Sequence, residues 1–362
     1  MFCPHHLQGP ADQVWTRSGL ICTCIWTCIW TCSFTTAKMK IASFNIQKFG
    51  RNKASDPTVM GILAKIVSRY DIILILEVVD ISGTSIKTLL EAINKANRKH
   101  HYTLQISSRL GRSRYKEQFM FLYRDDLVNL MDSYQFEDSK TLNQDVFSRD
   151  PYILRFKCHT TELQDLVLIP VHTTPEDSDV ELDKLYDVFM DIKKKWKTDN
   201  VMILGDFNAD GSYVSKKEMK TIRIRSDKNF HWLISDDQDT TASKKNSNTY
   251  DRIVIYGNDM LEAVVPGSAK PFNFQRAYGL SDELALDVSD HYPVEVTLKS
   301  KVPDDEDGGL DEDQLQRALV PAPSTVTVGE EVLALQKENL LLEREKLNLE
   351  IQMLKMQMEK LK

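Results

Sequence analysis

The sequence predicts an α/β protein in which two packed β-sheets are flanked by helices. Many short apolar runs with the spacing of buried strands fill the body of the chain, and a few amphipathic helical stretches separate them. Apolar residues make up 42% of the 362 residues, which is enough for a sizeable core. A leucine repeat close to the C-terminal end predicts one further element, a coiled-coil helix.

Composition divides the chain into four parts. Residues 1–38 are a low-complexity leader rich in Cys, Trp and Thr, residues 39–300 form the body, residues 301–330 are an acidic linker, and residues 331–362 carry the leucine repeat. The linker has two basic and eight acidic residues, and we expect it to be disordered. It holds most of the formal net charge of −7, so the acidity of the chain does not exclude a polyanionic substrate.

Three interpretations of the leader remain open. It could be the apolar region of a signal peptide, which implies secretion if residues 1–37 act in that way. It could bind metal through its cysteines, or it could be a translated repeat ahead of a true start at Met39. The apolar run is shorter than the ~20 residues that span a membrane, so we expect no stable membrane insertion. The body contains a single cysteine, Cys158, which favours a reducing compartment, either cytoplasmic or nuclear.

The expected elements of the body follow from the spacing of apolar residues. Helices are expected over residues 57–70, 82–97 and 180–196. The first of them begins at Pro57, because proline suits the first helical position. Strands are expected over residues 40–45, 71–77, 102–106, 117–123, 152–157, 166–172, 201–204, 251–256 and 293–298.

The strand over residues 201–204 leads into the most informative stretch of the chain. The continuous apolar run predicts a strand that is covered on both faces. Gly205 follows it and would let the backbone approach another segment closely. Asp206 and Asn208 alternate with Phe207, so in an extended chain both side chains would point the same way.

Polar residues stand at many of the predicted strand ends, and strand ends of a packed sheet meet at one rim. These residues are Asn45, Glu77, Glu117, His172, Asp206, Asn208, Asp251, Asp290 and His291. Asn45, Glu77 and Asp290 offer the hard oxygen ligands that Mg²⁺ or Ca²⁺ prefers. The two histidines can move protons near neutral pH, and carboxylates could orient their rings. Together they suit metal-assisted attack of water on a phosphodiester.

Seven short motifs also carry a resemblance to a known family. They are Ser43-Phe-Asn45-Ile, Leu76-Glu77-Val, Tyr115-Lys-Glu117, Pro170-Val-His172, Gly205-Asp-Phe-Asn208-Ala, Tyr250-Asp251-Arg and Ser289-Asp290-His291. In this order they resemble the deoxyribonuclease I family of the endonuclease/exonuclease/phosphatase superfamily, and the likeness extends from Lys40 to about Lys299. The resemblance implies a four-layer sandwich of two packed mixed β-sheets flanked by helices.

The resemblance further implies a metal-dependent endonuclease that hydrolyses DNA to 5′-phosphate ends, with Mg²⁺ (or Mn²⁺) and Ca²⁺ as cofactors. It implies that His172 with Glu117 and His291 with Asp251 form acid–base pairs. The same resemblance implies further roles for matched positions: Asp206 and Asn208 in catalysis, Asn45, Glu77 and Asp290 at the metal, Arg149 and Tyr115 on the DNA minor groove and phosphate backbone, and Asp239, Thr241 and Ser243 in a structural calcium loop. Actin is a candidate partner, because one member of the family binds it.

The chain departs from the family pattern at several positions. A cysteine usually follows the Gly-Asp-Phe-Asn motif, but Asp210-Gly211-Ser212 stands there, and its partner position is Asn248-Thr249. The disulfide that the resemblance implies is therefore missing. Gln47 and Val79 stand where secreted members often carry arginines that contact DNA. Two alternative functions stay open, namely a phosphodiesterase acting on RNA or phospholipid head groups, and an inactive nuclease-like oligomer that binds DNA or actin.

The leucine repeat predicts self-association of the chain. Leucines recur at every seventh position from Leu333 to Leu361, with charged residues between them. One helix cannot bury such a stripe alone, so we expect a homo-oligomer. A peptide of residues 331–362 should therefore sediment as an oligomer at micromolar concentration, and a monomer under these conditions would contradict the prediction.

Overall fold

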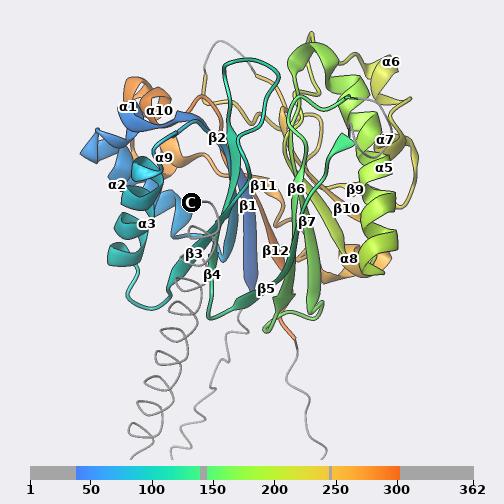
Figure 1. Ribbon diagram of the computed structural model, residues 1–362, viewed down its shortest axis with the longest axis horizontal. Coiled ribbons are helices and arrows are strands. Elements are labelled where there is room, and N and C mark those ends of the chain that lie inside the picture. The colour runs from blue at the N-terminus through green and yellow to red at the C-terminus, as the bar shows by residue number, and fades with distance from the viewer. Residues whose placement is uncertain (1–37, 139–144, 244–246, 302–362) are drawn as a thin grey trace, which may run out of the picture. The chain divides into compact units, whose positions relative to one another are not determined.

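The computed structural model describes residues 38–138, 145–243 and 247–301 (Figure 1). The leader, nearly all of the acidic linker and the leucine repeat lie outside the described residues, so the coiled-coil prediction stays a prediction. The described chain forms two six-stranded mixed sheets with helices on their outer faces. This arrangement confirms the predicted fold class.

The first sheet has the strand order β11-β12-β1-β2-β4-β3. Its strands are β1 (Met39–Phe49), β2 (Ile72–Val78), β3 (Tyr102–Ile106), β4 (Gln118–Arg124), β11 (Lys270–Pro271) and β12 (Val294–Leu298). Five helices lie on its outer side: α1 (Arg51–Ala54), α2 (Pro57–Val67), α3 (Thr84–Ala96), α9 (Phe274–Tyr278) and α10 (Asp282–Val288) (Figure 1).

The second sheet has the strand order β5-β6-β7-β8-β10-β9. Its strands are β5 (Val128–Gln135), β6 (Tyr152–Cys158), β7 (Asp165–His172), β8 (Val201–Asp206), β9 (Phe230–Trp232) and β10 (Asp251–Tyr256). The outer side carries α5 (Ser178–Trp196), α6 (Lys216–Met219) and α7 (Arg223–Ser226), and two short elements, η1 (Pro175–Asp177) and α8 (Asn258–Ala263), complete the set (Figure 1). Among the described residues, no helix is long and apolar enough to cross a membrane.

All nine expected strands and all three expected helices are present, with ends that shift by a few residues. The elements that sequence analysis missed are β5, β9, β11 and the short helices. Much of β5 is exposed, because it is an edge strand, so its apolar alternation is weak. The other missed elements have two to seven residues each, which is too short for a periodic signal.

Each sheet contains one parallel strand pair, and a helix joins its two strands. In the first sheet β1 and β2 are parallel and α2 connects them, and in the second sheet β7 and β8 are parallel and α5 connects them. Parallel strands place their carboxyl ends at the same edge of a sheet. Both parallel pairs therefore direct the residues that follow them toward an edge of the sandwich.

The core of the sandwich consists of three apolar layers. One lies between the two sheets, and the others lie between each sheet and its helices. The central strand β8 contributes to two of them: Met202 and Leu204 pack between the sheets, whereas Val201 and Ile203 pack toward α5. The prediction that this strand is covered on both faces is thus confirmed.

Gly205 lies where β8 runs directly against β7. Its φ is +145°, and a Cβ at this position would stand 1.9 Å from the carbonyl oxygen of Val171. Real Cβ atoms do not approach backbone oxygens this closely, so no side chain fits without separating the two strands. Sequence analysis expected a close backbone approach at Gly205, and β7 is the segment approached.

We therefore expect Gly205→Ala to destabilise the fold by about 3 kcal/mol or more, because a strained and overpacked position has little room to relax. Chemical denaturation followed by circular dichroism measures this change. Gly61→Ala is the matched control, since Gly61 lies in α2 and a Cβ there would meet nothing within 4 Å. The control should be neutral or stabilising by about 1 kcal/mol, and equal stability of the two variants would contradict the prediction.

Candidate active site

Asp206 occupies the centre of the candidate site. It is the last residue of β8, and its direct neighbours on the adjoining strands are His172 at the end of β7 and Asp251 at the start of β10. All three are buried. The register of the second sheet alone therefore brings an imidazole and two carboxylates into one row.

His172 forms the first imidazole–carboxylate pair with Glu117. The His172 Nδ1 atom donates a hydrogen bond to Glu117 Oε1 at 2.5 Å. Glu117 precedes β4, so it reaches across from the first sheet. Burial favours the neutral ring, but the Glu117 carboxylate outweighs it, and the pKa of His172 lies above its ordinary value. The pKa of Glu117 is lowered, because His172 and Arg149 overcome the opposite effect of burial.

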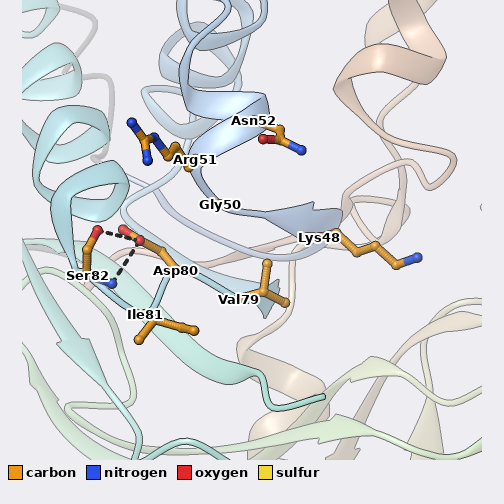
Figure 2. A pocket seen from close by; sticks show the side chains of 8 residues that line it. All are labelled: Lys48, Gly50, Arg51, Asn52, Val79, Asp80, Ile81 and Ser82. Carbon is orange, nitrogen blue, oxygen red and sulfur yellow. Dashed lines mark hydrogen bonds between the residues drawn. The ribbon is translucent and has the colours of Figure 1, made fainter. Parts of the chain in front are cut away.

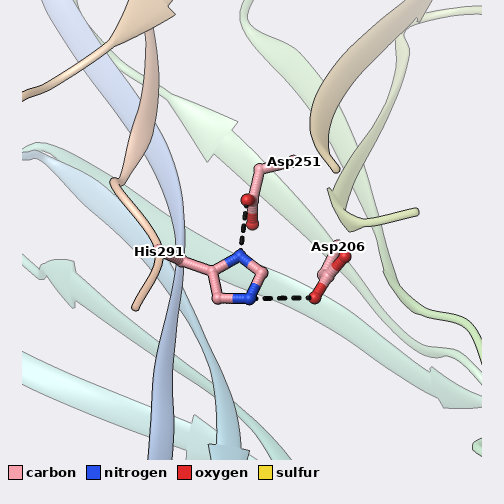
Figure 3. Close-up of side chains that lie close together, drawn as sticks. All are labelled: Asp206, Asp251 and His291. Carbon is pink, nitrogen blue, oxygen red and sulfur yellow. Dashed lines mark hydrogen bonds and ion pairs between the residues drawn. The ribbon is translucent and has the colours of Figure 1, made fainter. Parts of the chain in front are cut away.

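His291 forms the second pair with Asp251 (Figure 3). Its Nδ1 donates to Asp251 Oδ2 at 2.7 Å. His291 precedes β12 in the first sheet, whereas Asp251 belongs to the second sheet, so this pair also joins the two sheets. Burial opposes protonation of His291, but the carboxylates of Asp251 and Asp206 dominate and raise its pKa.

The two pairs converge on a single oxygen atom. The Nε2 atom of His172 lies 3.8 Å from Asp206 Oδ2, and the Nε2 atom of His291 lies 3.7 Å from the same oxygen. Asn45 Nδ2 donates to this oxygen at 3.1 Å. The free nitrogens of both imidazoles thus face one small region between the sheets.

The residues expected at the metal lie beside the two pairs. Asn45 Nδ2 also donates to Glu77 Oε1 at 3.0 Å. Asn45 was expected at a strand end, but β1 continues to Phe49, and Asn45 lies where its register with β2 shifts. At this site three buried carboxylate oxygens have no hydrogen-bond partner, namely Glu117 Oε2, Asp251 Oδ1 and Asp290 Oδ1. Ligand atoms of Asp206, Asp251 and His291 also lie within 4.8 Å of one another. Unpartnered buried oxygens and clustered carboxylates fit a divalent cation.

Lys53 hydrogen-bonds to backbone groups near two of the residues expected at the metal, and sequence analysis did not identify it. Its Nζ donates to the carbonyl oxygens of Ile46 at 2.7 Å and Val288 at 2.8 Å. Ile46 directly follows Asn45 in the chain, and Val288 lies two positions before Asp290. Burial lowers the pKa of Lys53 to about 8. A lone lysine in a polar helical turn carries no sequence signal for this role.

The side chain of Asn208 does not follow the strand alternation that sequence analysis expected. β8 ends at Asp206, and Asn208 adopts a left-handed conformation with φ of +46°. Its backbone N–H donates to Asp206 Oδ1 at 3.1 Å, and its Nδ2 donates to the carbonyl oxygen of Thr173 at 3.2 Å. β8 thus runs two residues beyond the expected strand, and Asp206 caps the turn that follows. Asn208 nevertheless contacts Asp206 and Thr173.

Arg149 and Tyr115, which the resemblance assigned to DNA contact, line a cavity over the first pair. The cavity has a volume of about 340 Å³ and its other walls are Lys48, Glu77, Glu117 and His172. Arg149 pairs through Nε with Glu117 Oε1 and donates through a terminal nitrogen to the carbonyl oxygen of His172 at 3.2 Å. Tyr115 is 42% exposed, and its hydroxyl lies 3.5 Å from Glu77 Oε2. Arg149 is thus part of the site itself as well as of its surface.

A second cavity of about 440 Å³ shares Lys48 with the first. Figure 2 shows the residues that line this second cavity. Val79 and Ile81 form an apolar part of its wall, and the Ile81 side chain is 83% exposed. Asp80 is turned toward Ser82, from which Oδ1 accepts two hydrogen bonds (Figure 2). The absence of arginine at Val79 therefore leaves an apolar surface beside the site.

The expected calcium loop packs against the second pair. Asp239 Oδ1 accepts hydrogen bonds from the backbone N–H of Thr241 at 3.0 Å and from its hydroxyl at 2.7 Å. Thr241 forms an isolated β-bridge with His291, and the N–H of Ala242 donates to the carbonyl oxygen of Asp290 at 2.7 Å. Ser243, the last residue of the predicted calcium set, ends the described part of this loop.

The missing disulfide is replaced by a hydrogen-bonded clamp. Asp210 Oδ2 accepts a hydrogen bond from the backbone N–H of Thr249 at 2.8 Å. A Cβ on Gly211 would stand 2.9 Å from Asn248 Oδ1, so the two positions that lack cysteine do face each other. Among the described residues Cys158 is the one cysteine, and it is buried and free.

Comparison with known proteins places the chain in a family. Residues 42–291 match the model of the endonuclease/exonuclease/phosphatase family. Human deoxyribonuclease gamma is 46% identical over 263 residues, which cover 72% of this chain and 86% of that protein. Bovine deoxyribonuclease-1 is 45% identical over 262 residues, which cover 72% of this chain and 92% of that protein.

The chain belongs to the deoxyribonuclease I family. A crystal structure of an endonuclease/exonuclease/phosphatase family protein from Bacteroides thetaiotaomicron has the same fold. Its TM-score is 0.50 at 14% identity, and the match covers 74% of this chain and 99% of that one.

The contact between His172 and Glu117 predicts that the pKa of His172 in the metal-free protein depends on the Glu117 carboxylate. Glu117→Gln removes the carboxylate that favours the protonated imidazole, so the pKa of His172 should fall. Titration of the histidine ring signals by NMR in the presence of a chelator measures it. Asp251→Asn is the matched control, because it should lower the pKa of His291 and leave that of His172 in place. An unchanged or higher pKa of His172 in Glu117→Gln would contradict the assigned pairing.

Proposed function

We propose that this member of the deoxyribonuclease I family is a divalent-metal-dependent endonuclease that hydrolyses DNA to 5′-phosphate ends by histidine general acid–base catalysis. Family membership supports DNA as the substrate, since the matched relatives are named deoxyribonucleases. The observation that carries the proposal is the convergence of two imidazole–carboxylate pairs on Asp206. Two proton-transfer groups that face one point are what hydrolysis of a phosphodiester requires.

The two histidines divide the proton transfers between them. One imidazole accepts a proton through Nε2 from the attacking water, and the other donates a proton to the leaving 3′-oxygen. Glu117 and Asp251 bind the Nδ1 atoms, so each ring keeps the orientation and tautomer that this exchange needs. Asp206 lies between the rings, and Asn208 hydrogen-bonds to it, so these two residues would hold the scissile phosphate there.

Asn45, Glu77 and Asp290 would hold Mg²⁺ or Mn²⁺ at this site. The unpartnered Asp290 Oδ1 and the nearby Glu77 carboxylate support this role. A bound divalent ion supplies positive charge that stabilises the additional negative charge on the phosphate oxygens. We further propose Ca²⁺ at Asp239, Thr241 and Ser243, where the loop contacts His291 and Asp290 and could hold them in place.

Tyr115 and Arg149 would contact the DNA backbone next to the cleaved bond. Both line the cavity above His172, together with Lys48. A hydroxyl and two cations at the mouth of an acidic site suit the sugar and phosphates of a DNA strand. Lys48 also borders the second cavity, so the strand has a continuous surface to follow.

Plasmid nicking with Mg²⁺ and Ca²⁺ at neutral pH tests the proposal. Wild-type protein should nick supercoiled DNA, and a chelator should abolish the activity. His172→Ala and His291→Ala should each lower the rate by at least about 100-fold, because general acid–base terms reach ~10²–10⁴. His159→Ala is the matched control, since His159 is exposed and hydrogen-bonds to Asn129 away from the site.

Nicking by either active-site variant at the wild-type rate would contradict the histidine assignment. Nicking that a chelator leaves unchanged would contradict the metal requirement. Folded wild-type protein that nicks no DNA would contradict the proposed activity as a whole.

A further inference from the structure

Glu181 is a buried carboxylate that the proposed chemistry does not use. It lies in the first turn of α5 and is 1% exposed. Buried glutamates are rare unless a partner holds them, because burial of a charge is costly. The burial raises the pKa of Glu181 to about 7. An ionisable residue kept in the interior at this cost calls for an explanation from its contacts.

Glu181 contacts the chain segment that follows His172. Its Oε1 accepts a hydrogen bond from the backbone N–H of Thr174 at 3.0 Å. Thr173 lies between His172 and Thr174, and its hydroxyl donates to the carbonyl oxygen of Phe207 at 2.7 Å. The carbonyl oxygen of Thr173 accepts a hydrogen bond from Asn208 Nδ2. Each residue from His172 to Thr174 therefore has at least one hydrogen bond that fixes its position, and Glu181 provides the one at Thr174.

Arg149 links Glu181 to the first imidazole–carboxylate pair. Its terminal nitrogen donates to the carbonyl oxygen of His172 at 3.2 Å and lies 3.5 Å from the hydroxyl of Thr174. Its Nε pairs with Glu117 Oε1, the same atom that accepts from His172. Arg149 therefore contacts Glu117 of the first pair and both ends of the His172–Thr174 segment, and Glu181 holds the Thr174 end of that segment.

We propose that Glu181 is a positioning residue that anchors the His172–Thr174 segment, to which Arg149 also donates. Without Glu181 the N–H of Thr174 loses its buried acceptor. The segment can then shift, and the ring of His172 moves relative to Glu117 Oε1. The imidazole loses part of the contact that orients it. This inference rests on the proposed role of His172 in acid–base catalysis.

The test compares Glu181→Ala, Glu181→Gln and wild type in plasmid nicking. The alanine variant should lower kcat by about 10- to 100-fold, because small displacements of a catalytic group have effects of this size. KM should change by no more than about 2-fold, because Glu181 does not reach the cavity that takes DNA. Glutamine keeps an oxygen that accepts from Thr174, so it should recover most of the lost kcat. Glu176→Ala is the matched control, since Glu176 is exposed in η1 between Thr174 and Glu181.

A second readout separates positioning from a general loss of stability and from a failure of the proposed activity. NMR titration of the chelated protein should give a lower pKa for His172 in Glu181→Ala than in wild type, with His291 unchanged. This measurement needs no catalysis, so it decides the inference even if wild-type protein nicks no DNA. A His172 pKa and a kcat that both match wild type would overturn it, as would equal losses of kcat in Glu176→Ala.

Discussion

The active site depends on the contact of the Asp206 carboxylate with groups from both sheets. Within its own sheet, Asp206 has His172 and Asp251 as cross-strand neighbours. From the other sheet, Asn45 and His291 reach the same oxygen atom. In each imidazole–carboxylate pair, one partner belongs to the first sheet and the other to the second. Both pairs can therefore form only when the two sheets are correctly positioned relative to each other. The apolar layer between the sheets sets this relative position, and core packing therefore determines the geometry of the candidate site.

The sequence predicted the strands with continuous apolar patterns and the residues at their ends. Strands β3 and β10 match the expected ranges, and Gly205 was expected at a close backbone approach for the correct reason. The prediction that Asn208 follows the strand alternation was wrong, because the strand ends at Asp206 and a turn capped by that residue follows. Supporting residues such as Lys53 and Glu181 could not be found, because their partners are backbone groups brought close by folding alone. A sequence pattern reports periodic burial and gives no information on which backbone groups become neighbours.

The electrostatic arrangement of the site is unfavourable by itself. Three buried carboxylate oxygens lack hydrogen-bond partners, and Asp206 and Asp251 are directly opposite each other on neighbouring strands. Like charges at such positions repel, and buried acceptors without donors cost free energy. The Nδ1–H donors of the two imidazoles offset part of this cost, and a divalent cation would offset more. The fold holds this arrangement because the surrounding strands are fully buried and cannot rearrange to relieve it.

The clamp between Asp210 and Thr249 has a consequence for how the protein reaches its native state. It holds the loop after Asn208 against the segment that leads into Asp251, the connection for which the family resemblance implies a disulfide. A carboxylate–amide hydrogen bond forms as soon as the two loops meet, whereas disulfide formation takes seconds to hours and needs an oxidant. For the described part of the chain, assembly of the catalytic rim is therefore limited by backbone folding rather than by thiol chemistry, and full activity should return on refolding under strongly reducing conditions.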